Sequence, residues 1–596
     1  MIPRRGGGAL AAALLPVVAL TLAACGAGAG AAASAAAGSP VQGGTLRLLG
    51  AGDVDHLDTA SAYYTASTTL ERAFTRQLFT YPASANAQRA ITPVADAAAG
   101  VPTKANGGIS ADGRTYTVRI RPGVKWDTSP ARQVTAQDFV RGFKRLCNPV
   151  SPVGAPSYYT GTIAGMKQYC DAFAKVPGTA SAIARYIDTH DISGIRADGD
   201  MTLVFTLTRP ANDFLNLLAM PFASAAPKEY MSYVPDDASF RRHTISDGPY
   251  QITKYAPNRE IDLARNPAWS QAADPIRHQY VDQIQIREGQ TDPGTVQQQI
   301  QAGTADLEWD TVVPTPDIPK LRAAEDPRLG VYPALDSNPF LVFNLQSPNN
   351  GKALRNVKVR RALEYAIDKV AIGQIYGGPA LNTPLNQVIP PGNVGYQPFD
   401  PYPTPGAKGE PATCKTMLAQ AGYPHGLTLD YVYRNAGNHP AVTQSVQADL
   451  QACGVTVKLV PQTAADFYSK YLSSPAAARQ GLWDIAAPGW VPDWYGNNGR
   501  AIVEPLFDGR SYGPNSTDWG DYDNPAVNRL IDRALAEQDS AKAAALWHQA
   551  DVQIMKDAPF IPFETQKTAV FHSSRVHGTV YLPTSQNYDI TQVWLS

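Results

Sequence analysis

The chain has little of what enzymes and nucleic-acid-binding proteins usually depend on. Its 596 residues include five cysteines and nine dispersed histidines, and the formal net charge is -1. A balance so near zero argues against a general nucleic-acid binder, although it leaves room for a local basic patch. The sequence contains no Gly-x-Ser-x-Gly elbow, no Gly-x-x-x-x-Gly-Lys phosphate loop, no His-Glu-x-x-His and no cysteine pair at zinc spacing. We therefore expect no catalysis, no metal and no cofactor.

The apolar run near the N-terminus, Ala9 to Leu22, is too short to span a bilayer as a stable helix. It follows Arg4 and Arg5, and a basic segment before a short apolar one is typical of an export signal. The alternative interpretation is a short buried helix.

The letters LAACG at 22–26 resemble a bacterial lipobox, in which Cys25 becomes the acylated first residue of the mature chain. We predict a lipoprotein signal peptide at 1–24 and a flexible tether of Gly, Ala and Ser at 25–43. Because several acyl chains hold a protein firmly, the resemblance implies attachment to the membrane surface, on the extracytoplasmic face of the cell membrane.

Four cysteines remain once Cys25 is assigned to the lipid. An even number in an exported protein suggests two disulfides, and four cysteines allow three pairings. We favour Cys147 with Cys170 and Cys414 with Cys453, since each pair is near in sequence and flanks helix-like segments. Free buried thiols are the competing interpretation.

Strand-like and helix-like patterns alternate along the chain. Alternating apolar residues predict strands that include 202–207 and 281–287, and amphipathic spacing predicts helices that include 210–220 and 356–369. The 49 prolines and 48 glycines predict many loops between short elements. Together these patterns predict an α/β protein.

One stretch combines a hairpin with a capped helix. The letters RPGVKW at 121–126 end the predicted hairpin, and TAQDFV at 135–140 begin a helix that Thr135 can cap. Asp138 falls in the first helical turn, where an acid suits the helix dipole, so we assign it a structural role. Asp53 and Asp55 are interpreted as turn-forming residues rather than as a general acid and base.

These motifs resemble the extracellular solute-binding proteins of the oligopeptide, dipeptide and nickel ABC importers, family 5. The resemblance extends from about residue 44 to about residue 576. Further motifs of the family follow in the same order: SDGPY at 246–250, QQQIQAGTADL at 297–307, VRRALEYAID at 359–368 and GWVPDW at 489–494.

The resemblance implies a two-lobed periplasmic-binding-protein-like clamshell (type II, class C) with an extra inserted subdomain. The lobes are expected to be discontinuous in sequence. The first lobe would comprise residues 44–82, 201–330 and 556–596, the inserted subdomain 83–200, and the second lobe 331–555.

The candidate binding site is the stretch WDIAAPGWVPDWYGN at 483–497. Its apolar start predicts a buried strand end, which is where ligands usually bind in α/β sheets. Asp493 lies among Trp490, Trp494 and Tyr495 with no base beside it in the sequence. A carboxylate with aromatic walls suits a primary ammonium group in a partly dry pocket. The alternative is that the aromatic residues are core and Asp493 caps a turn.

The family resemblance implies that Asp493 takes the amino terminus of a peptide ligand. The adjoining Gly489 and Val491 complete the motif, and Ala487 stands where some oligopeptide binders have arginine. The resemblance also places the backbone around a second segment alongside the ligand: Tyr63, Tyr64 and Thr65.

The implied function is that of a lipid-anchored, monomeric receptor. It would capture oligopeptides or dipeptides between hinged lobes and deliver them to the permease of an ABC importer, without chemistry on the ligand. Rival ligands within the family are a nickel chelate, haem or a sugar, and His56 is the local candidate for nickel. Rivals from other classes are a secreted hydrolase and an adhesion or signalling lipoprotein.

Overall fold

A computed structural model describes residues 38–596, apart from 154–156, 334, 464–465 and 514–515. The expected signal peptide, the lipobox cysteine Cys25 and most of the tether lie outside the described residues. The chain divides into two units, Met1–Ser39 and Pro40–Ser596, and all that follows concerns the second. Among the described residues, no helix is long and apolar enough to cross a membrane.

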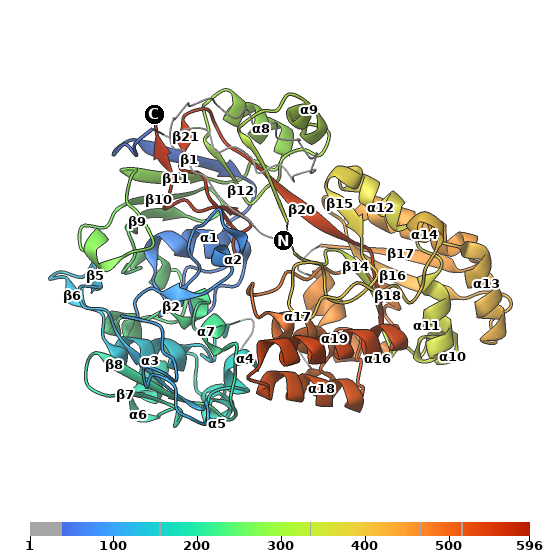
Figure 1. Cartoon of the computed structure of the whole chain (residues 1–596), viewed down its shortest axis with the longest axis horizontal. Helices are drawn as coiled ribbons and strands as arrows, with labels where there is room; N and C mark the ends of the chain where they lie inside the picture. The colour runs from blue at the N-terminus through green and yellow to red at the C-terminus, as the bar shows by residue number, and fades with distance from the viewer. Residues whose placement is uncertain (1–37, 154–156, 334, 464–465, 514–515) are drawn as a thin grey trace, which may run out of the picture. The chain divides into compact units, whose positions relative to one another are not determined.

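A first five-stranded sheet joins strands that are far apart in the sequence. Its members are β1 (Thr45–Gly50), β9 (Tyr250–Ala256), β10 (Glu260–Arg265), β11 (Gln283–Arg287) and β12 (Leu307–Trp309). The order is β12-β1-β11-β10-β9; β1 is parallel to both neighbours and β10 is antiparallel to both. Figure 1 shows blue β1 beside green β11. Helices α1 (Thr65–Phe74) and α8 (Pro293–Gln301) contact this sheet.

A smaller sheet occupies the segment expected to be the inserted subdomain. It is made of β4 (Thr115–Arg119), β7 (Ile195–Ala197) and β8 (Thr202–Thr206), in the order β4-β8-β7. Because β8 pairs with both other strands, this sheet crosses the expected boundary at residue 200. The helices here are α3 (Ala136–Arg145), α5 (Met166–Phe173) and α6 (Ala180–Thr189), and the helix expected at 210–220 is reduced to α7 (Phe214–Leu217).

The helix α3 begins as the sequence predicted. The Thr135 backbone N–H donates to Asp138 Oδ2 at 3.0 Å, which satisfies one of the unpaired donors at the helix start. The same carboxylate accepts from the Trp126 indole at 3.0 Å and from Arg132 at 2.9 Å. Asp138 is therefore a structural residue, as its place in the first turn indicated.

A second five-stranded sheet lies later in the chain. It contains β14 (Phe340–Phe343), β16 (Thr428–Arg434), β17 (Thr456–Gln462), β18 (Ile485–Ala486) and β19 (Phe560–Pro562), in the order β17-β16-β18-β14-β19. β16 is parallel to β17 and β18, whereas β14 is antiparallel to β18 and β19. Since β19 belongs to this sheet, the sheet also crosses the boundary expected at residue 555.

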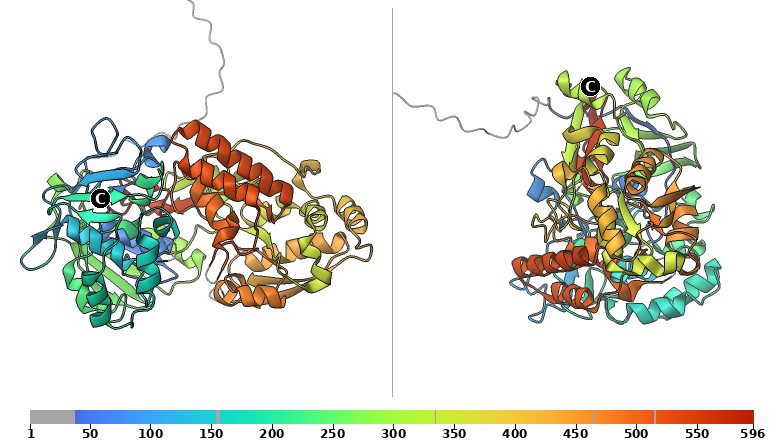
Figure 2. Two further views of the ribbon diagram at one scale, coloured as in Figure 1. Left: turned by 90° about the horizontal axis from the view of Figure 1, so that it is seen from below. Right: turned by 90° about the vertical axis from the view of Figure 1, so that its right-hand side faces the viewer.

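The helices of this second region follow the amphipathic patterns with one exception. They are α11 (Val357–Glu364), α12 (Lys369–Ile375), α13 (Pro411–Gln420), α14 (His439–Ala452), α18 (Pro525–Ala536) and α19 (Ser540–Asp557). Figures 1 and 2 show α18 and α19 side by side. The single helix expected at 356–369 is broken, because Asp368 Oδ1 accepts from the Ala371 N–H at 2.8 Å and caps a new helix.

A third sheet is built from strands that lie before, between and after the strands of the second sheet in the sequence. It consists of β13 (Leu329–Pro333), β15 (Asn382–Pro384) and the long β20 (Glu564–Phe571), which pairs antiparallel with both. The expected return of the chain near residue 556 is thus made by β20 directly after β19.

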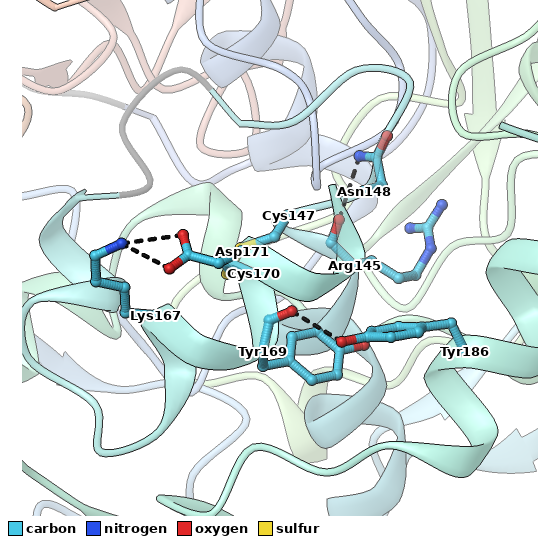
Figure 3. Close-up of a disulfide and its surroundings, with 8 residues drawn as sticks. All are labelled: Arg145, Cys147, Asn148, Lys167, Tyr169, Cys170, Asp171 and Tyr186. Atoms are coloured by element: carbon cyan, nitrogen blue, oxygen red, sulfur yellow. Dashed lines mark hydrogen bonds and ion pairs between the residues drawn. A yellow bond between two sulfur atoms is a disulfide. The ribbon is translucent and has the colours of Figure 1, made fainter. Parts of the chain in front are cut away.

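Two disulfides link the pairs that the sequence spacing favoured. Cys147, just after α3, is bonded to Cys170 in α5, with 5.2 Å between their Cα atoms (Figure 3). Cys414 in α13 is bonded to Cys453 at the end of α14, with 5.6 Å between the Cα atoms. Each bond joins two helices that lie in the same core. In the unfolded chain, each bond restricts the conformations of the segment between its two cysteines.

Replacing each cysteine pair by alanine should lower the free energy of unfolding. The bonds close loops with separations of 23 and 39 residues, and the chain-entropy relation gives about 3 and about 4 kcal/mol for such loops. Urea denaturation of the two double variants, followed by tryptophan fluorescence, measures the loss. Equal stability of a double variant and the unaltered protein would contradict the assignment of that bond as stabilising.

Candidate functional site

The candidate site begins where β18 leaves the second sheet. The Trp490 N–H donates to the Ser337 carbonyl at 2.9 Å, and the Ser337 N–H donates to the Trp490 carbonyl at 3.1 Å. Gly489 is needed beside this bridge, because a Cβ there would lie 1.8 Å from Asn338 Oδ1. The loop is thus held closely against the segment that precedes β14.

Asp493 is held by two tyrosine hydroxyls from distant parts of the chain. The Tyr63 hydroxyl donates to Oδ1 at 2.7 Å and the Tyr158 hydroxyl donates to Oδ2 at 2.6 Å. Within the described residues, no lysine, arginine or histidine forms an ion pair with this carboxylate. A carboxylate can accept about four hydrogen bonds, so roughly half of its capacity is left for a ligand.

The electrostatics of this group favour a cation. Burial raises the pKa of Asp493 to about 6, while the hydroxyls of Tyr158 and Tyr63 oppose that rise by stabilising the charged form. Burial and the carboxylate together hold the pKa of both tyrosines well above 10. At neutral pH the site therefore presents one negative charge flanked by neutral phenols.

Arg500, seven residues after Asp493, is occupied elsewhere. Its Nε donates to Glu504 Oε2 at 2.5 Å, and its Nη1 donates to Thr162 Oγ1 at 2.8 Å. The guanidinium lies over the Tyr158 ring, 5.4 Å from the centroid. It therefore contacts the face of the ring whose hydroxyl binds Asp493, and leaves the Asp493 charge uncompensated.

A cavity of about 590 Å³ opens beside Asp493. This volume is within the range of about 300–1,000 Å³ that is common for small-molecule sites. Its lining is largely aromatic, apolar and hydroxyl-bearing, with few charged groups. The aromatic members among the described residues are Tyr63, Tyr64, Tyr81, Phe222, Tyr468, Trp490 and Trp519.

Seven of the nine expected ligand-binding residues line this cavity. They come from two segments that are more than 400 residues apart in the chain: Tyr63, Tyr64, Thr65, Gly489, Trp490, Val491 and Asp493. Thr65 and Tyr64 are exposed, and Tyr64 retains 63% of its accessible surface. The structure thus places both segments at one cavity, as expected for a shared site.

Trp494 and Tyr495 do not line the cavity and were wrongly expected to be walls. They are 0% and 1% exposed. The Trp494 ring packs edge-on against Tyr158, with 4.9 Å between ring centroids. These two aromatic residues belong to the core behind the site, and Trp494 supports the tyrosine that holds Asp493.

Tyr158 is the residue that sequence reasoning missed. It lies in the short helix α4 (Ser157–Thr160) and is 335 residues from Asp493 in the chain. A doublet of adjacent tyrosines, like the one at Tyr63 and Tyr64, is the local feature that marks it. That doublet is equally compatible with core packing, so the partnership with Asp493 is visible only in three dimensions.

His56, the candidate for a nickel ligand, does not line the cavity. Its Nε2 lies 2.9 Å from Ser151 Oγ and its Nδ1 lies 3.2 Å from Asp55 Oδ2. Asp55 also accepts from the Tyr63 N–H at 2.8 Å. These contacts fit the turn-forming role predicted for this acidic loop.

Comparison with known proteins identifies the family. Residues 100–509 match the family of bacterial extracellular solute-binding proteins, family 5 Middle. The chain belongs to this family. As a family 5 solute-binding protein, it is the substrate-binding component of an ABC importer, acts outside the cytoplasm and is a receptor rather than an enzyme.

Individual relatives of this family 5 protein agree on the fold. The periplasmic oligopeptide-binding protein OppA of Escherichia coli (strain K12) is 26% identical over 468 residues, 76% of each chain. Heme-binding protein A of Haemophilus influenzae is 26% identical over 493 residues, 80% of each chain. The solved structure of clavulanic acid biosynthesis oligopeptide binding protein 2 superposes with a TM-score of 0.81 at 27% identity, covering 93% of this chain and 96% of that one. The fold is therefore the α/β periplasmic-binding-protein fold with mixed sheets.

We expect Asp493→Asn to stabilise the unliganded protein at pH 8. The folded-state pKa of about 6 lies above the usual value near 3.9, so above pH 6 the buried charge destabilises the fold. As the pH falls from 6 to 4, the folded state gains a proton and the destabilisation disappears. The shift corresponds to a gain of up to about 3 kcal/mol for the amide variant at pH 8 and almost none at pH 4.

Urea denaturation of both proteins at pH 4, 6 and 8 measures this difference. A variant that is equally stable or less stable at pH 8 would show that the carboxylate is neutralised within the protein.

Proposed function

We propose that this family 5 protein is a monomeric, lipid-anchored receptor for oligopeptides or dipeptides. It captures them between two hinged lobes and delivers them to the permease of an ABC importer. Asp493 binds the amino terminus of the peptide, and Cys25 carries the lipid that holds the receptor on the extracytoplasmic face of the cell membrane. Six residues of the cavity lie alongside the bound peptide: Tyr63, Tyr64, Thr65, Gly489, Trp490 and Val491.

The observation that carries this proposal is the uncompensated carboxylate in a large cavity. Asp493 lines the 590 Å³ space and has acceptor capacity left after its two tyrosine partners. A primary ammonium group can supply three donors and the missing positive charge. Hydrogen bonds to charged groups contribute about 1.5–3 kcal/mol, which is enough to fix one end of a ligand.

The rest of the lining suits ligands of varied sequence. Aromatic faces and hydroxyl groups dominate it, and hydroxyls can both donate and accept hydrogen bonds. Such a surface can contact many side chains, while pairing with the peptide backbone gives affinity that does not depend on sequence. The name of the oligopeptide-binding relative from Escherichia coli agrees with this assignment.

Two rival ligands fit the lining less well. The name of one relative suggests haem, but haem carries two carboxylates and the arginine among the described lining residues is already paired with Asp589. A nickel ion would need histidine, and no histidine is found among the described residues that line the cavity. The ammonium group of a peptide needs neither a free base nor a histidine, and a peptide brings one terminal carboxylate where haem brings two.

Asp493→Asn should weaken the binding of peptides with a free amino terminus by at least tenfold at pH 7.5. Mass spectrometry of material released on denaturing the protein from its host first identifies peptides, and titration calorimetry then measures their affinity. Acetylating the amino terminus of the same peptide should reduce binding to the unaltered protein by a similar factor. Affinity should also fall as the pH drops below 6, because Asp493 becomes protonated.

Glu364→Gln is the matched control for this experiment. Glu364 is a buried acid, 3% exposed, that does not line the cavity, and its substitution should leave peptide affinity within about twofold. Release of a non-peptide ligand alone, or equal affinity for free and acetylated peptides, would refute the proposed function.

A further inference from the structure

The charges that line the cavity are strongly unbalanced. Among the described lining residues the acids are Glu71, Asp310 and Asp493, and the base is Arg72. Arg72 is already committed, since its Nε and Nη2 donate to Asp589 Oδ2 at 3.0 and 2.8 Å. A ligand carboxylate therefore meets no unpaired base in this lining, whereas a ligand cation meets three acids.

Glu71 is the least satisfied of these acids. It is 2% exposed, and its Oε1 is buried without a hydrogen-bond partner. No ion pair to it is formed within the part of the chain that the structure describes. A buried carboxyl group with an unsatisfied oxygen costs free energy, and such groups call for a physical explanation. Because Glu71 faces the cavity, the missing partner can be supplied by a ligand.

The surroundings of Glu71 are themselves acidic. Burial raises its pKa well above 4.5, and the charges of Asp55, Asp58 and Asp236 raise it further. Each of these three acids already forms an ion pair with another residue of the protein. The partners are His56 for Asp55, Arg145 for Asp58 and Arg241 for Asp236. Arg72, the neighbour on the same helix, is held by Asp589. Burial and these acidic neighbours therefore favour the neutral form of Glu71, and a cation arriving beside it would favour the charged form.

Glu71 shares one face of a helix with two other residues of the lining. Tyr64, Thr68 and Glu71 follow one face of α1 and all line the cavity. The seven residue steps from Tyr64 to Glu71 correspond to a rise of about 10 Å along the helix. An extended peptide advances about 3.3 Å per residue, so Glu71 lies about three residues beyond the point where the ligand passes Tyr64.

We propose that Glu71 receives a second cationic group of the ligand, so that the preferred substrates are basic peptides with a lysine or arginine after the first residue. The inference rests on the proposed function, because the amino terminus must first be placed at Asp493. The geometry and the unbalanced lining support it jointly: one acid binds the terminus, the other binds a side chain, and the base of the described lining, Arg72, is paired with Asp589.

Tetrapeptides of alanine with one lysine at position 2, 3 or 4 test this proposal. Each is compared by titration calorimetry with the peptide that has norleucine at the same position, which keeps the aliphatic chain and lacks the ammonium group. At the best position the lysine peptide should bind at least tenfold more tightly than the norleucine peptide at pH 7. In Glu71→Gln the ratio should fall to about twofold or less.

Two further variants separate this inference from the proposed function. Glu364→Gln, which alters a buried acid outside the cavity, should keep the tenfold ratio. Asp493→Asn should weaken the lysine and norleucine peptides together.

Equal affinity of the two peptides for the unaltered protein at every position, or an unchanged ratio in Glu71→Gln, would overturn the role of Glu71 and leave the proposed function standing. Failure of every peptide to bind the unaltered protein would overturn both.

Discussion

A carboxylate that the protein holds in place without neutralising it is the constraint on which the binding site depends. Asp493 is fixed by hydroxyls of Tyr63 and Tyr158, two neutral donors that come from segments 430 and 335 residues away. Had the same position been held by arginine, the charge would be compensated inside the fold and a ligand cation would gain little. Phenol donors fix the geometry and leave the charge for the ligand. The cost is a less stable unliganded state, which ligand binding offsets.

The lack of a base at this site does not reflect a shortage of bases, because the chain has 51 basic and 52 acidic residues. Buried arginines elsewhere are paired, and their pairs tie distant segments together, as Arg145 does with Asp58 at 2.8 Å and Arg277 with Asp96 at 2.8 Å. Such pairs satisfy their charges at folding and are closed to ligands. By contrast, the three acids of the cavity, Glu71, Asp310 and Asp493, form no ion pair among the described residues. Charges that maintain the fold are thus paired within the protein, whereas the charges proposed to recognise a ligand are not.

Local patterns predicted the elements that depend on local interactions. The alternation at 202–207 and 281–287, the capped start of α3 and the buried end of β18 were all confirmed, because period, cap chemistry and chain breaks are local properties. The prediction of one continuous helix over 356–369 was wrong, since a polar residue inside an amphipathic pattern can either face solvent or cap a new helix. Aromatic residues in a loop posed a similar ambiguity: Trp490 faces the cavity, whereas Trp494 faces the core. Tyr158 and the exposure of Glu71 to the cavity follow from tertiary packing, so no local pattern could show them.

The buried aromatic residues behind the candidate site fix the loop that carries Asp493. Trp490 donates from its indole to the Ala501 carbonyl at 2.7 Å, and Trp494 packs on Tyr158. The loop that carries Asp493 is therefore ordered by folding, and a ligand does not have to order it again. The lining also includes exposed Tyr64 and hydroxyl groups, which can adapt to different side chains. Under the proposed function, a rigid acid in an adaptable lining would discriminate by the position of positive charge along the ligand and tolerate variation between those charges.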